Sequence, residues 1–530
     1  YDGDKIRFRQ GTPEKIGGWT QISANTFLGV CRSLHNWITL GGQNLIGIGT
    51  HLKFYVENIG SYFDVTPLRA SVSLTNPFTT VSGSATVTVT DANGGYINGD
   101  YVTFSNATAV GGLTIDGEFV VSLGVTSAAG TFTITAASTA SSSATGGGTV
   151  TAAYQINVGN PFAVPITGWG AGSWSQGTWG VGESSIKAIR FWSQSNFGED
   201  LIFGHAGGAI YYWDATGNVS TRAVSLSSLS GASDVPVVQN LILVSDISRF
   251  VFCFGTNTIG SSSVDPTLIR WSDQGDPTNW TPSEVTQAGD LQLSRGTKIV
   301  AARQSRQEVL VWTDSSLYSL QFVGGQAVWG ASLVGENISI SSQNAVAYAN
   351  GVAYWMGKDK FYMYDGRTQP LKCDVRKYVF NDFNTAQYSQ VFSGTNESFH
   401  EIWWFYCSSS ATNIDEYVIY NYQEKIWYYG TLARTAWVDS GLRNSPLAAT
   451  YSFNLVDHED GIDNNEGASA VAIAAFIESS DFDIGDGDRF SLINRVIPDV
   501  SFDGSTASTP AATMTLHALA SSGSGRNSPV

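Results

Sequence analysis

The sequence predicts an all-β protein, a β-propeller of about six blades with an inserted small β-domain and a C-terminal β-domain. Three observations predict this class. Helical periodicity is nearly absent, and short strand-like runs bounded by Gly, Asn, Asp and Ser dominate. In addition, one phrase recurs: an apolar strand, a polar turn, and a strand rich in Tyr, Phe and Trp.

The recurring phrase predicts the blades of the propeller core, residues 1–74 and 159–445. It first appears at residues 45–55 and then returns five times. Its later apolar strands are marked by Ile202, Val251, Val309, Val352 and Ile402, at intervals of 49, 58, 43 and 50 residues. Periods near 40–50 residues with several strands each are typical of propeller blades. Hairpins of an ordinary meandering sandwich are the alternative.

An inserted domain is predicted over residues 75–158, where Ser, Thr, Ala, Gly and Val displace Trp, Arg and Lys. Residues 85–90 and 131–135 alternate with period two, as strands with one buried face do. We therefore expect a small β-sandwich or barrel placed in a loop of the propeller, since exposed loops tolerate insertions. A disordered Ser/Thr/Ala linker is the alternative.

The composition shifts again after residue 445, which predicts a C-terminal β-domain over residues 446–530. It begins with an acidic stretch, residues 457–463, followed by apolar runs at 470–477 and 490–500. Residues 514–519 alternate before the chain stops, so we expect this domain to be truncated. The chain also opens without Met in a patterned segment, and we expect its true start to lie upstream.

Charge and cysteine content exclude several classes of function. With 28 Lys+Arg against 45 Asp+Glu, the formal net charge is −17, which argues against a broad basic surface that grips nucleic acid. Four widely spaced cysteines predict buried or incidental thiols instead of a zinc site or a disulfide framework. The longest apolar run is residues 470–477, too short to span a bilayer, so no stable membrane insertion is expected.

Motifs for enzyme chemistry are not found, so we predict no catalytic residues, no cofactor and no enzymatic activity. The weak metal candidate is a run of carboxylates that suits Ca²⁺, with Asp481, Asp483, Asp486 and Asp488 as ligands. The run departs from a calcium loop because its fifth position is glycine and Leu492 stands where a Glu should close the site. An acidic structural turn is the alternative.

A glycine-rich loop carries three tryptophans at five-residue spacing, Trp169, Trp174 and Trp179. Large aromatic side chains anchor protein interfaces, and glycine permits the turns between them. We predict an interface loop here, with self-packing over the propeller as the alternative.

A single segment, SDQGDPTNW at residues 272–280, resembles the Asp-box turn of sialidase-type propellers, although its Trp comes late. It supports an alternative function, a glycan-binding or glycan-cleaving propeller that acts on host surface sugars. Cleavage would need two carboxylates across one cleft.

Several phrases resemble the tail nozzle, or tail hub, proteins of short-tailed bacteriophages. They are YDGDKIRFR (1–9), PEKIGGW (13–19), the glycine-rich loop (168–180), WSD to WTP (271–282), AGD with LSRG (288–296), and ESSD to PD (478–499). The resemblance spans most of the chain except the insert.

This resemblance implies a virion structural protein in the phage tail. Its propeller subunits would form a ring, a homohexamer, below the portal and adaptor proteins, and would anchor tail fibres or a needle. The ring would extend the DNA ejection channel, and the family supplies no catalytic residues. Six copies would carry a formal charge of −102, six times −17, so genomic DNA would pass without tight binding. A structural β-protein without a channel is a further alternative.

Overall fold

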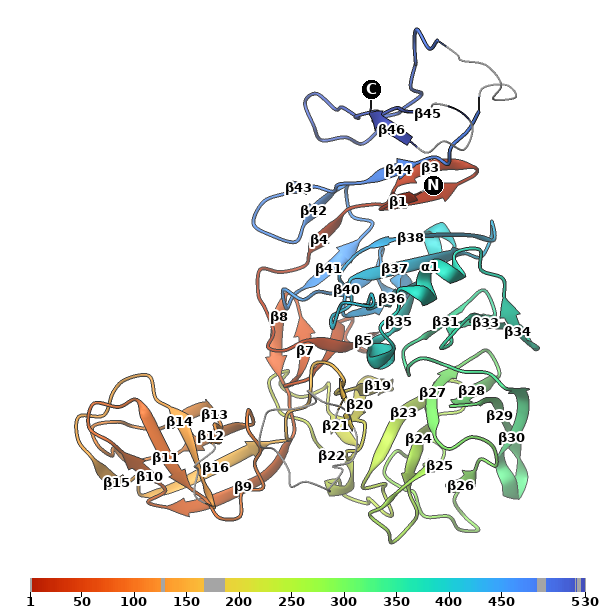
Figure 1. Ribbon diagram of the computed structural model, residues 1–530. Coiled ribbons are helices and arrows are strands. Elements are labelled where there is room, and N and C mark those ends of the chain that lie inside the picture. The colour runs from red at the N-terminus through yellow and green to blue at the C-terminus, as the bar shows by residue number, and fades with distance from the viewer. Residues whose placement is uncertain are drawn as a thin grey trace, which may run out of the picture.

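The computed structural model describes residues 2–124, 129–165, 186–483, 492–519, 521 and 526–529. Over these residues the chain forms seven sheets that follow one another around a central axis (Figure 1). Neighbouring sheets contact each other through their first strands or share one hydrophobic core. The seventh sheet packs against the first and closes the circle. This is a β-propeller, so the predicted all-β class is confirmed.

Six blades are each formed by one continuous stretch of chain, as four-stranded antiparallel meanders. They are blade 1, β5 (Cys31–Ile38), β6 (Asn44–Thr50), β7 (Phe54–Asn58), β8 (Ser61–Asp64); blade 2, β19 (Trp192–Phe197), β20 (Asp200–His205), β21 (Tyr211–Trp213), β22 (Val224–Ser225); blade 3, β23 (Gln239–Ser245), β24 (Phe250–Asn257), β25 (Val264–Trp271), β26 (Gly289–Gln292); blade 4, β27 (Ile299–Gln304), β28 (Glu308–Thr313), β29 (Ser316–Gly324), β30 (Val328–Glu336); blade 5, β31 (Val346–Ala349), β32 (Val352–Met356), β33 (Phe361–Tyr364), β34 (Thr368–Leu371); and blade 6, β35 (Phe392–Asn396), β36 (Glu401–Tyr406), β37 (Glu416–Asn421), β38 (Ile426–Thr431).

The seventh blade combines both ends of the chain. Its strands are β39 (Ala436–Val438), β40 (Leu447–Ala449), β41 (Leu455–His458) and β4 (Trp19–Gln21), with Trp19 opposite His458. The sheet continues through β42 (Asp463–Asn465) and β43 (Val471–Ala472). The expected six blades are therefore seven. The seventh escapes a search for repeats because three of its strands are short and the fourth comes from the N-terminus.

This blade also corrects the predicted domain boundary at residues 445/446, which falls between the hydrogen-bonded strands β39 and β40. Residues 447–472 thus belong to the propeller. The change of composition that suggested the boundary reflects short strands joined by polar turns, not a new core.

The second strand of each blade explains the recurring phrase. Every residue of β24 and β36 is buried, because neighbouring blades cover both faces of the sheet. The five marker residues of the phrase all fall on second strands, β20, β24, β28, β32 and β36. Large rings fill the wedges between blades: Trp312 and Trp355 meet edge to face with ring centroids 5.4 Å apart. Three of the four cysteines are buried here as free thiols, as predicted.

The insert is a β-sandwich, as the alternation predicted. Its strands are β9 (Leu68–Thr75), β10 (Phe78–Thr80), β11 (Thr86–Thr90), β12 (Tyr101–Ser105), β13 (Gly117–Val120), β14 (Thr131–Thr135), β15 (Ala144–Gly146) and β16 (Thr149–Gln155). They form two four-stranded sheets around one apolar core. The insert begins at Leu68, before the predicted residue 75, because β9 keeps Leu and Arg and the compositional change follows it.

The N-terminal residues pair with a segment near residue 477 outside the propeller. β1 (Asp2–Asp4) pairs with β44 (Phe476–Glu478), and β2 (Ile6–Arg9) forms a hairpin with β3 (Thr12–Lys15). The remaining elements are β17 (Val164–Pro165), β18 (Ile186–Lys187), β45 (His517–Leu519), β46 (Arg526–Pro529), α1 (Arg376–Asn381) and five short 3-10 turns, at Leu226–Ser228, Gly325–Ala327, Thr385–Gln390, Glu397–Phe399 and Ser440–Leu442. None of the helices in the described ranges could span a lipid bilayer.

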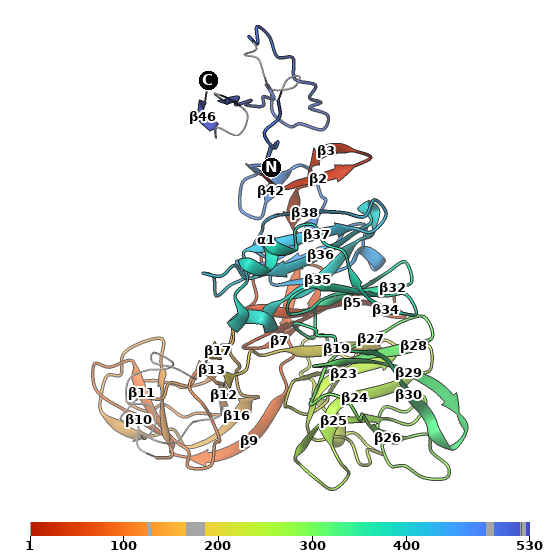
Figure 2. The ribbon, with the colours of Figure 1, turned by 45° about the vertical axis from the view of Figure 1, so that its right-hand side comes forward.

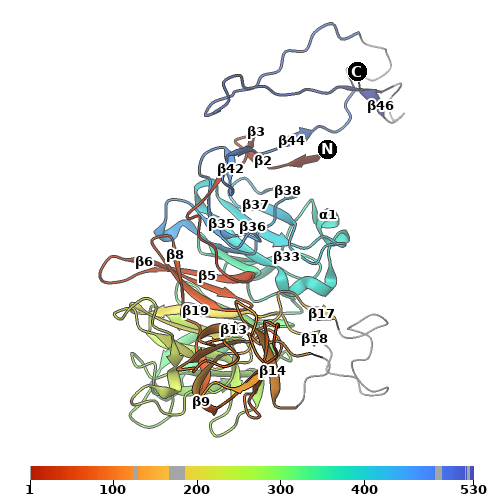
Figure 3. The ribbon, with the colours of Figure 1, turned by 90° about the vertical axis from the view of Figure 1, so that its left-hand side faces the viewer.

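After β44 the chain runs away from the propeller as an extended segment, which we name the C-terminal arm, residues 479–483 and 492–516 (Figures 1 and 3). Where it is described, the arm holds no strand, and every residue from 492 to 516 is exposed. Among the described residues, the predicted C-terminal β-domain is therefore not a packed unit, because no second layer there covers the apolar side chains of residues 492–516. The arm and the insert lie at opposite ends of the molecule (Figure 2).

Candidate functional site

The central channel of the propeller is the candidate site. A cavity of about 130 Å³ lies on the axis, lined by the inner strands β5, β19, β23, β27, β35 and β39 and by residues 343–344 just before β31. All seven blades therefore contribute to it. Water occupies about 30 Å³ per molecule, so the cavity has room for about four waters. The channel of one chain suits a small ligand and not a polymer.

At one end of the channel, where the inner strands begin, a chain segment that returns from the insert crosses between the blades. Arg32 Nη2 donates to the Pro161 carbonyl at 2.9 Å and to Gln390 Oε1 at 2.7 Å. Gln387 exchanges two hydrogen bonds with the Ala163 backbone, at 3.2 and 2.8 Å. These contacts fix residues 156–165 across the channel end.

The other end of the channel carries a mixed group of charges. Crowding by the blades lowers the pKa of the Arg303 guanidinium and raises that of the Asp439 carboxyl, although both side chains keep contact with solvent. The Thr395 N–H donates to Asp439 Oδ1 at 2.6 Å. His35 bonds Asn196 Oδ1 through Nε2 at 3.0 Å, and burial lowers its pKa, so its ring is neutral at pH 7. This end offers polar groups of both signs.

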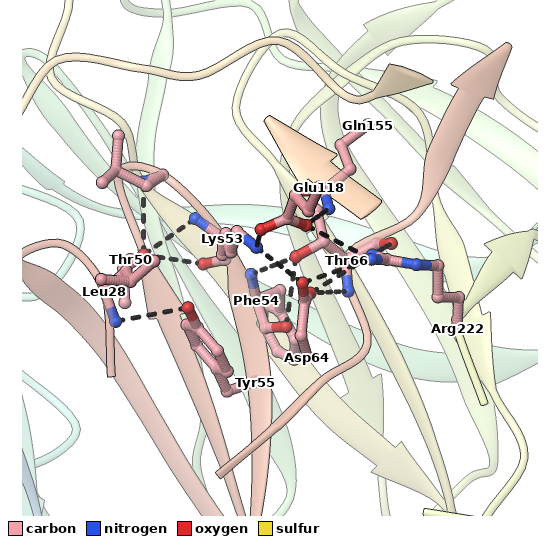
Figure 4. A network of polar contacts seen from close by, with 11 residues as sticks. Leu28, Thr50, Lys53, Phe54, Tyr55, Asp64, Thr66, Glu118, Gln155 and Arg222 are labelled. Carbon is pink, nitrogen blue, oxygen red and sulfur yellow. Dashed lines mark hydrogen bonds and ion pairs between the residues drawn. The ribbon is translucent and has the colours of Figure 1, made fainter. Parts of the chain in front are cut away.

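A polar network joins the insert to the propeller (Figure 4). Lys53 Nζ contacts Asp64 Oδ2 at 2.8 Å and, from the insert, Glu118 Oε1 at 2.5 Å. Arg222 of blade 2 lies 3.3 Å from Asp64 and 3.8 Å from Glu118. Gln155 Nε2 donates to Glu118 Oε2 at 2.6 Å. Burial raises the pKa of Asp64, but Lys53 and Arg222 outweigh it and lower that pKa. The network holds the sandwich in a defined orientation.

A second ionic cluster ties the N-terminal hairpin to blade 6. Arg7 is 2% exposed and bonds Glu401 Oε1 through Nε at 2.9 Å and Glu459 Oε1 through Nη2 at 2.5 Å. Its guanidinium carbon lies 3.6 Å from the centre of the Phe399 ring. Trp403 Nε1 donates to Glu401 Oε2 at 2.9 Å. Both carboxylates are thus held by one arginine, an arrangement that stabilises the fold and does not flank an open cleft.

The segment that resembles an Asp-box fixes a turn between β25 and β26. Ser272 Oγ accepts from the Val251 N–H at 3.0 Å, and Asp273 Oδ1 accepts from the Gln287 N–H at 2.8 Å. Trp280 is 1% exposed, and its Nε1 donates to the Pro277 carbonyl at 2.8 Å. The polar groups of this segment therefore hold its own loop.

The sequence-predicted site residues are only partly described. Trp169, Trp174 and Trp179 lie outside the described residues, as do Asp486 and Asp488. Asp481 and Asp483 stand on the exposed C-terminal arm. Within the described residues, no three His, Cys, Asp or Glu side chains gather closely enough to hold a metal ion.

Sequence reasoning missed Arg7, Arg32, Lys53 and Glu401. A signal exists for Arg32, Lys53 and Glu401, because each is a single charge inside or beside an apolar strand run, as in CRSLHNWI around Arg32 and EIWWFY, which begins at Glu401; Arg7 has no such signal, since it stands between Lys5 and Arg9. Charged side chains are almost never fully buried unless they are paired. Arg32, Lys53 and Glu401 were therefore candidates for a buried polar contact.

No protein-family model and no curated protein matches the chain. Among solved structures it is similar to phage phi92 endosialidase, with 12% identity over 95% of this chain and 70% of that one, at a TM-score of 0.20. It is also similar to the WD40 domain of SCAP from fission yeast (9% identity, 86% and 98% covered, TM-score 0.30) and to Hsv2 of Kluyveromyces lactis (12%, 51% and 73%, 0.29). Similarities this low leave the propeller assignment to rest on the sheet topology.

Proposed function

We propose that this chain is a non-enzymatic structural subunit of a phage virion, a tail nozzle protein whose copies form a ring that extends the DNA ejection channel. The phrases that resemble tail nozzle proteins suggest the identity of the assembly. The exposed C-terminal arm is the structural observation that supports an assembly of several copies. We propose a homohexamer that joins the portal and adaptor on one side and other tail parts, such as fibres or a needle, on the other.

The arm supports self-assembly because it presents large apolar side chains to solvent. Phe482 is 73% exposed, Leu492 85% and Ile497 71%. Others follow the same pattern: Ile493, Val496, Val500, Phe502, Met514 and Leu516. A 2.9 Å hydrogen bond from the Thr506 hydroxyl to Asp463 Oδ2 links the arm to the propeller. Exposed apolar side chains in such number mark interaction sites, since monomers rarely leave a large apolar area uncovered.

The size of the propeller channel decides where DNA would pass. A cavity with room for about four water molecules admits no duplex. The conduit would therefore lie between copies, around the axis of the ring, and each propeller would form part of its wall. A formal charge of −17 per chain favours passage over binding, because an acidic wall repels phosphate.

The insert suits an outward role in such a ring. It projects from the propeller at the end opposite the arm (Figures 1 and 2), and its network with Lys53 and Arg222 holds it at a fixed angle. We propose that it decorates the ring or contacts fibres or the host surface.

The assembly experiment compares arm variants by light scattering after size exclusion. The wild-type chain should elute as a ring of defined mass. A Leu492→Ser, Ile497→Ser variant should shift toward monomer, because it removes two of the most exposed apolar side chains of the arm. The matched control is Leu40→Ser, Val285→Ser, which changes side chains 91% and 92% exposed outside the arm and should assemble normally. A wild-type monomer at high concentration would contradict the proposal.

The glycan-binding alternative is favoured by the Asp-box-like turn, which occupies the connection between the third and fourth strands of blade 3. A glycan array separates the two functions. A conduit protein should show no sugar selectivity, whereas a lectin-like propeller should retain a defined set of glycans.

A further inference from the structure

We infer that the end of the central channel at which Arg32 lies is a binding site for a small inorganic anion such as phosphate or chloride. The inference concerns the propeller itself and does not rest on the proposed function. Arg32 comes near the start of β5, lines the cavity of about 130 Å³, and is only 2% exposed. Its hydrogen bonds, its charge and its surroundings each point to a missing anionic partner.

The hydrogen bonds of Arg32 are incomplete. A guanidinium group carries five N–H donors. Nη2 uses its two on the Pro161 carbonyl and Gln390 Oε1. Nε and Nη1, which carry the other three, are buried and reach no acceptor at hydrogen-bond distance in the described part of the protein, although Arg32 is close enough to the Tyr451 hydroxyl to oppose the rise in pKa that burial causes there. Buried donors are nearly always satisfied in folded proteins. An acceptor that enters the cavity would complete the set.

The charge of Arg32 is also unbalanced. Burial raises the pKa of the Cys31 and Cys407 thiols to about 12 and raises that of the Tyr451 hydroxyl as well. Burial, followed by the charge of Arg32, lowers the pKa of His51 to about 4. These neighbours are all neutral at pH 7, and no carboxylate in the described ranges forms an ion pair with Arg32. A buried charge is otherwise paired or coordinated.

A second guanidinium strengthens the positive potential at this end. Arg190 Nη2 donates to the Asn157 carbonyl at 2.7 Å, and its guanidinium carbon lies 5.8 Å from the ring of Trp192, which lines the cavity. Burial lowers the pKa of Arg190 to about 10, so it stays protonated at pH 7. The Asp100 carboxylate already offsets part of the charge of Arg190, so an anion in the cavity would chiefly reduce the cost of burying Arg32.

The size of the cavity limits the ligand. Room for about four water molecules accommodates a halide or a single phosphate ion, but not a nucleotide or a bulky organic sulfonate. This limit provides an internal control, because a bulky sulfonate carries negative charge and should not enter.

The test is calorimetric titration of inorganic phosphate into the full chain, kept in a bulky sulfonate buffer at pH 7.5. We expect one site per chain. Arg32→Gln should weaken phosphate binding at least tenfold, because it removes the charge and the unpartnered donors. Arg306→Gln, at an exposed arginine, is the matched control and should bind phosphate like the wild type. At a hundred times the dissociation constant, phosphate should raise the wild-type melting midpoint by roughly 3 °C over sulfonate at equal ionic strength.

Two results would overturn the inference. One is a wild-type chain that gives neither binding heat nor a phosphate-specific midpoint shift, since water alone would then fill the cavity. The other is Arg32→Gln binding phosphate like the wild type, which would place the anion elsewhere. Should Arg32→Gln fail to fold, wild-type crystals grown in bromide decide. An anomalous peak within hydrogen-bond distance of Arg32 Nε or Nη1 supports the site, and an empty cavity refutes it.

Discussion

Replacing Arg7 by Met should destabilise the propeller strongly, because one buried arginine joins the N-terminal hairpin to blade 6. Its guanidinium makes four hydrogen bonds, at 2.9 and 3.2 Å to Glu401 and at 2.5 and 2.9 Å to Glu459. Met fills a similar volume but leaves Glu401, which is 0% exposed, without its cation. Breaking a buried ion pair in this way costs about 3–5 kcal/mol.

The assay is urea unfolding followed by tryptophan fluorescence. All sixteen tryptophans lie outside residues 68–155, and the thirteen that the structure describes belong to the propeller, so the signal does not come from the inserted sandwich. Arg9→Met is the matched control, since Arg9 stands two residues along the same strand and is exposed. It should change the free energy of unfolding by less than about 1 kcal/mol. An Arg7→Met variant as stable as Arg9→Met would refute the reasoning.

Three further predictions concern the closure of the propeller, its packing and the dependence of its stability on pH. Trp19→Ala removes a side chain that is 4% exposed in the closing strand and should lower the free energy of unfolding by about 3–5 kcal/mol in urea; a loss below 1 kcal/mol would contradict its closing role. Gly394→Ala places a Cβ against the Trp437 ring, closer than van der Waals contact, and should cost about 1–3 kcal/mol, whereas Gly441→Ala meets open space; equal melting midpoints would count against this packing. The pKa of His51 is lowered from 6.5 to about 4, so stability that is complete above pH 6.5 should fall by up to about 3 kcal/mol toward pH 4. His51→Gln should flatten that profile, and an unchanged acid sensitivity would rule out His51 as its source.

The sequence predicted the parts of the fold whose signals are local. Neighbouring blades cover both faces of the second strands, so these strands are mostly apolar. The sequences of β24 and β36 are therefore recognisable as buried strands. The insert stands out because its strands alternate between one core face and solvent. Both patterns follow directly from which faces are buried.

The parts that were mispredicted depend on distant pairing. Blade 7 joins β41 to β4 across more than 430 residues, with Trp19 opposite His458, and no local pattern announces that pairing. The candidate site is harder still to predict. As a single charge in an apolar strand, Arg32 is a candidate for a buried contact, but its partners, the segment around Pro161 and the Gln390 side chain, come from distant parts of the chain and cannot be predicted locally.

The central claim is that copies of this chain build a ring whose lumen, and not the propeller channel, carries DNA. Cryo-electron microscopy of the purified full chain tests this claim most directly. We predict a closed ring, with six copies, a central lumen wide enough for a DNA duplex, and the C-terminal arm of each copy packed on its neighbour. Isolated propellers with solvent-exposed arms at high protein concentration, or a ring without an open lumen, would contradict it.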